Sequence, residues 1–555
     1  MSALLFCQLR RALGSKGTTA EGIRISPLRR LVPGLFCMAL AGSAAAMDGR
    51  ISGHVRTDGE ALDGAMVTAR AVASGIETTV FSGDDGAYYL GSLDPGTYEV
   101  EAKIPGRSAP RRTLAIGGGE IARADFQAVP ASDYRRRLSS AHWLSLLPDG
   151  EMKREFLLNC TSCHEISYGR VMPDEVPRTS AGWLDAITLM RSIDVYGLTP
   201  PDFDDERYAA WLAEHLDARH IAELRPGTAA KGAVLAARIT EYPVPETPSL
   251  PHDIAIGPDG RVWITAFYNN VVWAIVPGSG ETQSYAVNES PERMGQVRAL
   301  TFDRDGMLWV LLGGTESVVR LNPTDGAIET FHVGLYPHSI EVDSAGKLWF
   351  NDYFSATERI GSIDPATGKV TLYQIPTAGL TPQEGLPLLY GLQVDRDDIV
   401  WGTMLAANKL FRFDSRGGGA RLFEMPHVNS GPRRLGIGPD GTVWIPEFNT
   451  GTLTRFAPET KAFTRHSLGF PSLGPYDVAV DQNSGHVWVT AALGSMLLRF
   501  DPATAVWDRY PLPTEPAYPR HIAIDGSSGD VWTTYSSMPD AVPKIVRIEL
   551  RAKPP

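Results

Sequence analysis

The chain has 555 residues, of which 43% are apolar and 21% are charged, and its formal net charge is −12. This length exceeds one ordinary hydrophobic core and predicts about three or four domains. The negative charge argues against nucleic acid as a partner, because nucleic-acid binding depends on attraction to the phosphates. A content of 55 glycines and 41 prolines indicates many turns between short strands.

The first 46 residues have the pattern of a secretory signal peptide. Arg29 and Arg30 precede the apolar run 31–40, and a stretch of small residues ends at Ala46. We expect cleavage near Ala46 and export to the periplasm of a Gram-negative bacterium, with no stable membrane insertion afterwards. The alternative is an uncleaved anchor, but the apolar run is short for a membrane span.

Residues 48–129 alternate between apolar and polar positions, and turn sequences separate the short runs. This pattern predicts a small antiparallel β-sandwich. Its characteristic runs are Gly53-His54-Val55, Leu62-Asp63-Gly64-Ala65, Asp85-Gly86-Ala87-Tyr88 and Pro95-Gly96-Thr97-Tyr98. With these runs the segment resembles carboxypeptidase regulatory-like domains, and the resemblance implies a non-catalytic module.

The run Cys160-Thr161-Ser162-Cys163-His164 is the attachment signature of a c-type haem. Its two thiols bind the porphyrin covalently, and the histidine is the proximal ligand of the iron. A redox disulfide and half of a zinc site are the alternatives, but a structural zinc needs four ligands and the sequence has no second such motif. Cys7 and Cys37 leave with the leader. We therefore predict one covalently attached haem c.

We expect a helical cytochrome c domain over residues 148–225. The order is the haem motif, then Trp183 and Met190 on one helix face, then an aromatic-rich final helix. This order resembles small class-I-type cytochrome c domains fused to periplasmic oxidases and dehydrogenases. Met190 is the expected second axial ligand of the iron, because its helix face would direct the thioether at the porphyrin. His215 and an open position are the alternatives.

Residues 237–550 contain an internal repeat of a strand, an Asp-Gly-type turn and a second strand with a tryptophan. The repeated tryptophans are 40 to 52 residues apart and are Trp263, Trp309, Trp349, Trp401, Trp444, Trp488 and Trp532. Seven such units predict a seven-bladed β-propeller, with the tryptophans as packing residues between blades. The last unit lacks an outer strand, and residues 238–243 match that strand, so we expect them to close the ring.

The phrases Pro-His-Asp-Ile, Gly-Pro-Asp-Gly and Val-Trp-Ile in these units resemble the virginiamycin B lyase (streptogramin lyase) propeller family. The resemblance covers all seven units. It implies enzymes that linearise a cyclic depsipeptide by elimination, using a magnesium ion, glutamates and a histidine base. A shared fold does not establish a shared activity, which depends on the residues at the expected site.

One residue per unit begins the innermost strand, and we expect these residues to meet at one mouth of the central channel. They are His252, Arg298, His338, Tyr390, Arg433, Tyr476 and Arg520. A second set ends the partner strands at the same mouth and consists of Ala266, Leu312, Asp352, Met404, Glu447, Ala491 and Tyr535. Three arginines on the mouth of an acidic protein predict a site for a small anionic organic ligand. The alternative is that these residues only hydrogen-bond to neighbouring units.

The family resemblance implies a histidine and a glutamate at these two positions of one unit. Glu447 is present, but Arg433 stands where the histidine is expected, and His338 shares its unit with Asp352 instead. We take His338, Asp352 and Glu447 as the candidate catalytic residues. Three arginines oppose a divalent cation, which argues against the family's reaction.

The sequence as a whole predicts a mainly β protein: a seven-bladed β-propeller preceded by a small β-sandwich and a small all-α cytochrome c domain. We expect a periplasmic haem protein in electron transfer, an oxidoreductase whose propeller binds a small anionic organic substrate or a redox partner protein. The alternatives are a non-enzymatic scaffold cytochrome and a carbon–oxygen lyase like virginiamycin B lyase.

Overall fold

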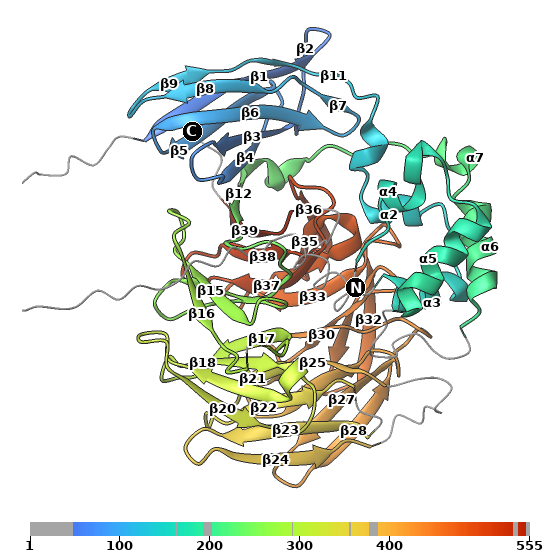
Figure 1. The fold of residues 1–555 in the computed structure, drawn as a ribbon, viewed down its shortest axis with the longest axis vertical. Coiled ribbons are helices and arrows are strands. Elements are labelled where there is room, and N and C mark those ends of the chain that lie inside the picture. Colours follow the sequence, from blue (N-terminus) through green and yellow to red (C-terminus); the bar gives the residue numbers. More distant parts are fainter. Residues whose placement is uncertain are drawn as a thin grey trace, which may run out of the picture.

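Strands dominate the computed structural model, which describes residues 48–550 apart from 162–163, 193–202, 291, 355–356, 377–386 and 537–541. The predicted leader lies outside the described residues, and export stays a prediction. Figure 1 shows a blue sandwich, a large assembly of sheets running from green to red, and green-blue helices along one side. Within the described part of the chain no helix is long and apolar enough to cross a membrane.

The N-terminal strands form two facing sheets around one core. The first sheet contains β1 (Gly49–Thr57), β2 (Glu60–Ala61), β5 (Ala87–Leu93), β9 (Ile121–Arg123) and β10 (Phe126–Gln127). The second contains β3 (Met66–Ala71), β4 (Glu77–Phe81), β6 (Gly96–Ile104), β7 (Arg107–Ser108), β8 (Arg112–Ile116) and β11 (Val129–Pro130). Alternate residues such as Ile51, Val67 and Val100 are fully buried between them. The predicted sandwich is therefore confirmed as a sandwich-like unit.

A helical segment follows the sandwich. Its elements are η1 (Tyr134–Arg137), α2 (Ser140–Leu144), α3 (Glu151–Cys160), α4 (Tyr168–Val171), η2 (Pro173–Glu175), α5 (Ser180–Ser192), α6 (Asp205–His215), α7 (Ala218–Ile221) and η3 (Gly232–Ala236). The expected all-α cytochrome c domain is not evident, because the core of this segment is continuous with that of the propeller-like sheets. Trp143, Phe156 and Leu212 belong to one hydrophobic cluster with Tyr476 and Tyr518 of the propeller-like sheets.

Six four-stranded antiparallel sheets follow one another along the chain. They are β13 (Pro251–Ile256), β14 (Val262–Ala266), β15 (Val271–Ile275) and β16 (Thr282–Ala286); β17 (Val297–Phe302), β18 (Leu308–Leu312), β19 (Ser317–Leu321) and β20 (Ile328–His332); β21 (Pro337–Val342), β22 (Leu348–Asp352), β23 (Arg359–Asp364) and β24 (Lys369–Gln374); β25 (Leu389–Val394), β26 (Val400–Met404), β27 (Lys409–Asp414) and β28 (Gly419–Glu424); β29 (Gly436–Ile437), β30 (Val443–Glu447), β31 (Thr452–Ala457) and β32 (Ala462–Ser467); and β33 (Pro475–Val480), β34 (Val487–Ala491), β35 (Met496–Asp501) and β36 (Val506–Pro511). This repetition confirms a propeller-like architecture.

The last repeating unit is completed from the other end of the chain. It contains β37 (Pro519–Ile524), β38 (Val531–Tyr535) and β39 (Lys544–Leu550), and β12 (Ala237–Pro243) pairs antiparallel with β39 along its whole length. The outer strand predicted at 238–243 is thus confirmed. The other edge of β12 pairs with β4, so the second sheet of the sandwich and these four strands form one ten-stranded sheet (Figure 1). The innermost strands β13 and β37, from the first and last units, lie against each other.

The repeated tryptophans pack between sheets, as expected. All seven are at most 3% exposed. The indole N–H groups of Trp309, Trp349 and Trp401 donate to Asp303, Asp343 and Asp395 at 2.8–2.9 Å. These aspartates lie in the turns after the innermost strands, so each turn is fixed to the tryptophan of its own sheet.

A buried ionic cluster lies where the sandwich meets the last unit. The Nζ atom of Lys544 on β39 is 2.8 Å from Glu241 on β12 and 3.0 Å from Glu77 on β4. Glu241 is fully buried and also accepts a hydrogen bond from Tyr535 at 2.7 Å. One lysine therefore neutralises two carboxylates on adjacent strands of the joined sheet.

Replacing Lys544 by methionine is expected to lower the free energy of unfolding by about 3–5 kcal/mol, because it leaves two carboxylates close together and without their cation. The matched control is Lys409→Met, since Lys409 pairs with Glu424, which is 73% exposed, and such a pair contributes about 0–1 kcal/mol. Urea unfolding midpoints compare the two variants. Equal losses in both would contradict a structural role for the Lys544 cluster.

Candidate functional site

A β-bulge at the start of the innermost strands places two consecutive residues at the channel. The register shifts after Pro251, Val297, Pro337, Leu389, Pro475 and Pro519. The Thr265 hydroxyl accepts the N–H of Asp253 at 2.8 Å and donates to the carbonyl of Arg298 in the next unit at 2.7 Å. The hydroxyl groups of Thr403 and Thr490 likewise accept a backbone N–H group within their own unit and donate to a backbone carbonyl of the next unit. These contacts fix the bulges against each other.

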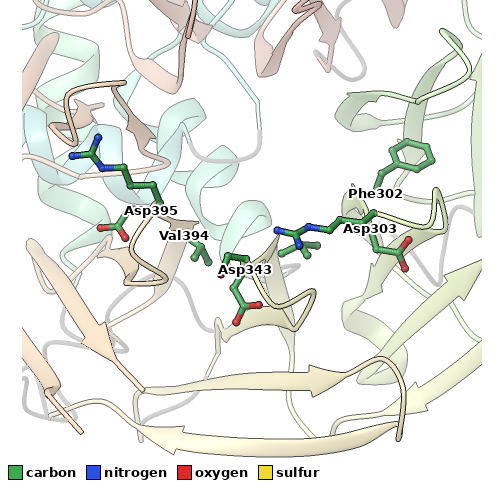
Figure 2. A pocket seen from close by; sticks show the side chains of 9 residues that line it. Phe302, Asp303, Asp343, Val394 and Asp395 are labelled. Carbon is green, nitrogen blue, oxygen red and sulfur yellow. The ribbon is translucent and has the colours of Figure 1, made fainter. Parts of the chain in front are cut away.

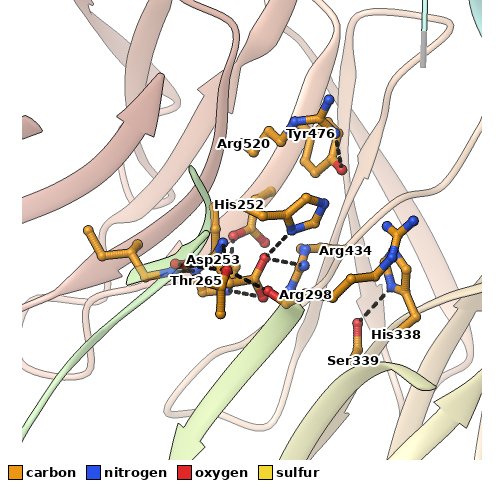
Figure 3. A network of polar contacts seen from close by, with 12 residues as sticks. His252, Asp253, Thr265, Arg298, His338, Ser339, Arg434, Tyr476 and Arg520 are labelled. Atoms are coloured by element: carbon orange, nitrogen blue, oxygen red, sulfur yellow. Dashed lines mark hydrogen bonds and ion pairs between the residues drawn. The ribbon is translucent and has the colours of Figure 1, made fainter. Parts of the chain in front are cut away.

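The ring residues expected at the mouth do converge. The hydroxyl groups of Tyr390 and Tyr476 hydrogen-bond to each other, and Arg433 and Arg520 donate to them at 3.2 and 3.0 Å. The imidazole rings of His252 and His338 lie 6.3 Å apart between centroids. Figure 3 shows the two imidazoles with Arg298 and Arg434 beside them. Side chains that are far apart in the sequence therefore form one buried polar site.

Aromatic rings surround the arginines of this site. The guanidinium of Arg433 lies 3.9 Å from the centroid of Phe448, and that of Arg520 lies 4.8 Å from that of Tyr518. Arg298 lies 5.0 Å from Phe267 and donates from Nε to the Tyr336 hydroxyl at 2.7 Å. Cation–π contacts of this kind offset part of the cost of burying a charge. The mouth is therefore both apolar in its walls and positive in potential.

Asp253 is a site residue that the sequence analysis missed. Its Oδ1 atom accepts from His252 Nδ1 and from Arg434, each at 2.7 Å (Figure 3). Burial acts to raise the pKa of Asp253, but Arg434 and His521 hold that pKa well below its ordinary value. The sequence signal was a polar residue directly after the ring residue in five of the seven units, and these residues include Asp477, whose pKa is raised by burial.

The hydrogen bonds of His252 and His338 fix their tautomers. His338 Nδ1 lies 3.0 Å from the Tyr390 carbonyl, which only accepts, so Nδ1 carries the proton and Nε2 carries the lone pair. His252 Nδ1 likewise faces the Asp253 carboxylate. Burial lowers the pKa of His252 to about 3 and that of His338 well below its ordinary value. Both imidazoles are neutral at neutral pH, and the buried Nε2 of His338 has no hydrogen-bond partner among the described residues.

The two candidate carboxylates are engaged away from the histidines. Asp352 accepts two bonds from Arg359, at 2.7 and 3.1 Å, and His338 bonds to the Tyr390 carbonyl instead. Glu447 is fully buried and accepts from Thr450, Thr454 and Arg465. In the part of the chain that the structure describes, no three His, Cys, Asp or Glu side chains cluster so as to hold a metal. The residues present do not fit the magnesium site that the family resemblance implies.

A shallow pocket lies at the opposite end of the channel. Figure 2 shows Asp303, Asp343 and Asp395 around it, with Phe302 and Val394. These carboxylates already accept from tryptophan indoles and from the backbone of their own turns. We interpret this pocket as a structural feature of the turns.

The residues of the predicted haem site lie in the helical segment, next to the mouth. Burial raises the pKa of the Cys160 thiol to about 12, and the neighbouring Thr161 carbonyl accepts from the Tyr518 hydroxyl at 2.7 Å. His164 Nδ1 is 3.1 Å from the Glu165 carbonyl. Met190 is half-buried near the end of α5, and His215 on α6 lies against the rings of Trp211 and His220. Cys163 lies outside the described residues.

The sheets and their convergent mouth define a β-propeller protein joined to a β-sandwich. Residues 232–386 and 387–551 match the virginiamycin B lyase family, and residues 50–129 match the carboxypeptidase regulatory-like domain. Because the first two matches cover more than half of the chain, the protein belongs to the virginiamycin B lyase family. The predicted propeller family and sandwich family are both confirmed.

Individual relatives agree with this assignment. A virginiamycin B lyase of Nocardia farcinica is 28% identical over 147 residues, which are 26% of this chain and 46% of that relative. The matched region thus spans less than half the length of this curated relative. The virginiamycin B lyase structure from Staphylococcus aureus is 21% identical with a TM-score of 0.50, over 56% of this chain and 99% of the other. A streptogramin B lyase structure is 20% identical with a TM-score of 0.51, over 57% and 99%. These structures show the fold.

The expectation of a cytochrome, with haem iron, metal binding and electron transfer as its properties, is corrected by these findings. They assign the propeller to a lyase family and the sandwich to a regulatory-like family, and the described residues contain no metal-binding cluster. The motif at residues 160–164 is local, and it does not determine the class of the rest of the chain. One covalently attached haem c at Cys160 and Cys163 stays a prediction, which the mass of the purified chain decides.

We expect the free energy of unfolding to fall as the pH is lowered from about 6.5 towards 3. In this window the unfolded chain takes up protons at His252 and His338, whereas the folded chain keeps both neutral. Each histidine contributes a slope of up to about 1.4 kcal/mol per pH unit. Urea unfolding across this range should show a shallower slope for His338→Gln and an unchanged slope for His332→Gln, which replaces an exposed histidine. Identical slopes in wild type and His338→Gln would contradict the neutral buried state.

Proposed function

We propose that the six four-stranded sheets and the strands β37, β38, β39 and β12 form a seven-bladed propeller whose mouth is a carbon–oxygen lyase site. The observation that carries this proposal is the convergence of Arg298 with the neutral imidazoles of His252 and His338. Membership of the virginiamycin B lyase family supports the same class of reaction.

The polar groups of the mouth indicate the chemistry of the ligand. The lone pairs of His252 and His338 accept hydrogen bonds from N–H or O–H groups, while the guanidinium of Arg298 donates to carbonyl or carboxylate oxygens. The aromatic walls around the arginines suit an apolar or aromatic side chain. A small organic acid, or a peptide or depsipeptide with an ester bond, offers all of these groups. We take such a molecule, and not a redox partner protein, as the substrate class.

The reaction is an elimination. A base removes a proton from the carbon next to a carbonyl group, the electron pair of that C–H bond forms a carbon–carbon double bond, and the adjacent carbon–oxygen bond breaks. The leaving group departs as a carboxylate with the electrons of the broken bond. A guanidinium stabilises both the enolate-like transition state and the departing carboxylate, because negative charge develops on oxygen in each.

The role of Asp253 is to orient His252. Its carboxylate fixes the proton on Nδ1 and so directs the Nε2 lone pair away from the Asp253 side. Arg434 holds the same carboxylate at 2.7 Å from a different sheet. The Nε2 atom of His252 is therefore a hydrogen-bond acceptor at the mouth, and the imidazole ring carries only one N–H proton.

Virginiamycin B is the first probe, because the family takes its name from this compound. Elimination gives a linear product of unchanged mass, whereas hydrolysis adds one water, so mass spectrometry after chromatography distinguishes the two. Arg298→Gln is expected to lower kcat/KM by roughly 10²–10³, which is the usual effect of removing one donor to a developing oxyanion.

The matched control is Arg304→Gln, an exposed arginine at the opposite end of the channel, which should leave kcat/KM unchanged. The proposal fails if the wild-type protein neither binds nor linearises virginiamycin B. Hydrolysis in place of elimination would also overturn it.

A further inference from the structure

The Tyr390–Tyr476 pair is the part of the mouth that the proposed function leaves without a role. The two phenol oxygens hydrogen-bond to each other from β25 and β33. Arg433 donates to the Tyr390 oxygen at 3.2 Å, and Arg520 donates to the Tyr476 oxygen at 3.0 Å. The exposed fractions of the two tyrosines are 3% and 0%. The pair is thus a buried unit enclosed by two cations.

The contacts of the two phenol oxygens indicate how many hydrogen atoms the pair carries. Two neutral phenols carry two hydrogens, and only one of them can lie between the two oxygens. Besides the hydrogen bond that the two phenol oxygens share, each oxygen has one further contact, with a guanidinium group. Guanidinium groups only donate hydrogen bonds. A second phenolic hydrogen has no acceptor in these contacts, and a buried donor left without an acceptor destabilises the folded protein. A pair with one hydrogen satisfies every contact.

The electrostatic surroundings favour the same state. The guanidinium of Arg433 lies 4.7 Å from the ring centroid of Tyr476, and that of Arg520 lies 5.4 Å from it. Burial acts to raise the pKa of Tyr476, but Arg520, Arg433 and Arg434 outweigh it and bring that pKa below its ordinary value. The neutral imidazole of His338 and the ring of Tyr353 lie against the Tyr390 ring. Burial and the neighbouring Tyr476 raise the pKa of Tyr390 well above its ordinary value. Because two guanidinium groups lie against the Tyr476 ring, we assign the shared hydrogen to Tyr390.

We propose that Tyr390 and Tyr476 share a single hydrogen at neutral pH, and that the Tyr476 oxygen of this tyrosine–tyrosinate pair is the proton acceptor of the mouth. This inference rests on the proposed lyase function for its role, but the ionisation state stands on its own contacts. In the elimination, the substrate C–H bond breaks and an O–H bond forms on Tyr476, while the electron pair moves into the new double bond and the carboxylate leaves.

The histidines are less suited to this step. A carbon acid needs a base of substantial proton affinity, and burial lowers the pKa of His252 to about 3. A neutral imidazole with such a low pKa is a good hydrogen-bond acceptor and a poor base. The tyrosine pair is the stronger base, because burial opposes part of the stabilisation that the arginines give its negative charge, so its conjugate acid is a weaker acid than the imidazolium of His252.

The test is an ultraviolet difference spectrum at neutral pH between folded protein and protein unfolded in urea. The folded protein is expected to absorb as about one tyrosinate, and unfolding should abolish this band because the free phenols become neutral at the same pH. Tyr476→Phe should lose the folded-state band. Tyr510→Phe should retain it, since Tyr510 is a buried tyrosine of the same propeller whose pKa burial raises to about 12.

Arg520→Gln provides a second variant that keeps both tyrosines. It should raise the apparent pKa of the pair by at least one unit and reduce the tyrosinate band at neutral pH, whereas Arg304→Gln should not. No tyrosinate band in folded wild-type protein at neutral pH would overturn the proposal, even if virginiamycin B is still linearised. A tyrosinate band without turnover would support the ionised pair and would count against the lyase function alone.

A kinetic readout separates a base from a structural residue. Tyr476→Phe should lower kcat for elimination by about 10²–10⁴ and remove the acidic limb of its pH profile. If the acidic limb persists in this variant, another group is the base and the proposal is wrong.

Discussion

The pairing of β12 on both of its edges is the constraint on which the rest of the structure depends. One edge bonds to β39 and completes the last repeating unit with a strand from before the first. The other edge bonds to β4 and joins the sandwich to the same sheet. The mouth is assembled from residues on separate sheets, so its distances depend on this closure. An outer strand with a free edge invites pairing with other chains, and β4 occupies that edge here.

Within the closed ring, burial decides the charge state of each polar group. It keeps His252 and His338 neutral, whereas the arginines remain charged because aromatic faces and phenol oxygens replace part of their hydration. Asp253 stays ionised because Arg434 and His521 face it. The mouth therefore combines neutral acceptors with cationic donors, which is an arrangement for binding an acyl group and stabilising charge on its oxygens.

Much of this fold and part of this site follow from the sequence. The period of the tryptophans gives the repeating unit, and counting back from each tryptophan finds the ring residues that converge, such as Tyr390 and Tyr476. Taking one residue per unit missed Asp253, because the β-bulge turns two successive side chains to the channel. Spacing also could not show that Asp352 and Glu447 bind Arg359 and Arg465. The cytochrome prediction relied on a local motif, but the helices around Cys160 share their core with the propeller, and no spacing rule reports such a shared core.

The position of β12 in the chain also bears on how the protein is made. During synthesis β4 and β12 both emerge before the six complete sheets, whereas β39 follows only after all of their strands. Until then the sandwich is the only partner available to β12, and pairing with β4 would hold it extended and shielded from wrong partners. The sandwich is in this sense a template for the final step of folding, in which the last-made strand finds one free edge in the correct register. A chain without its N-terminal module would have to close the same ring around an unsupported strand.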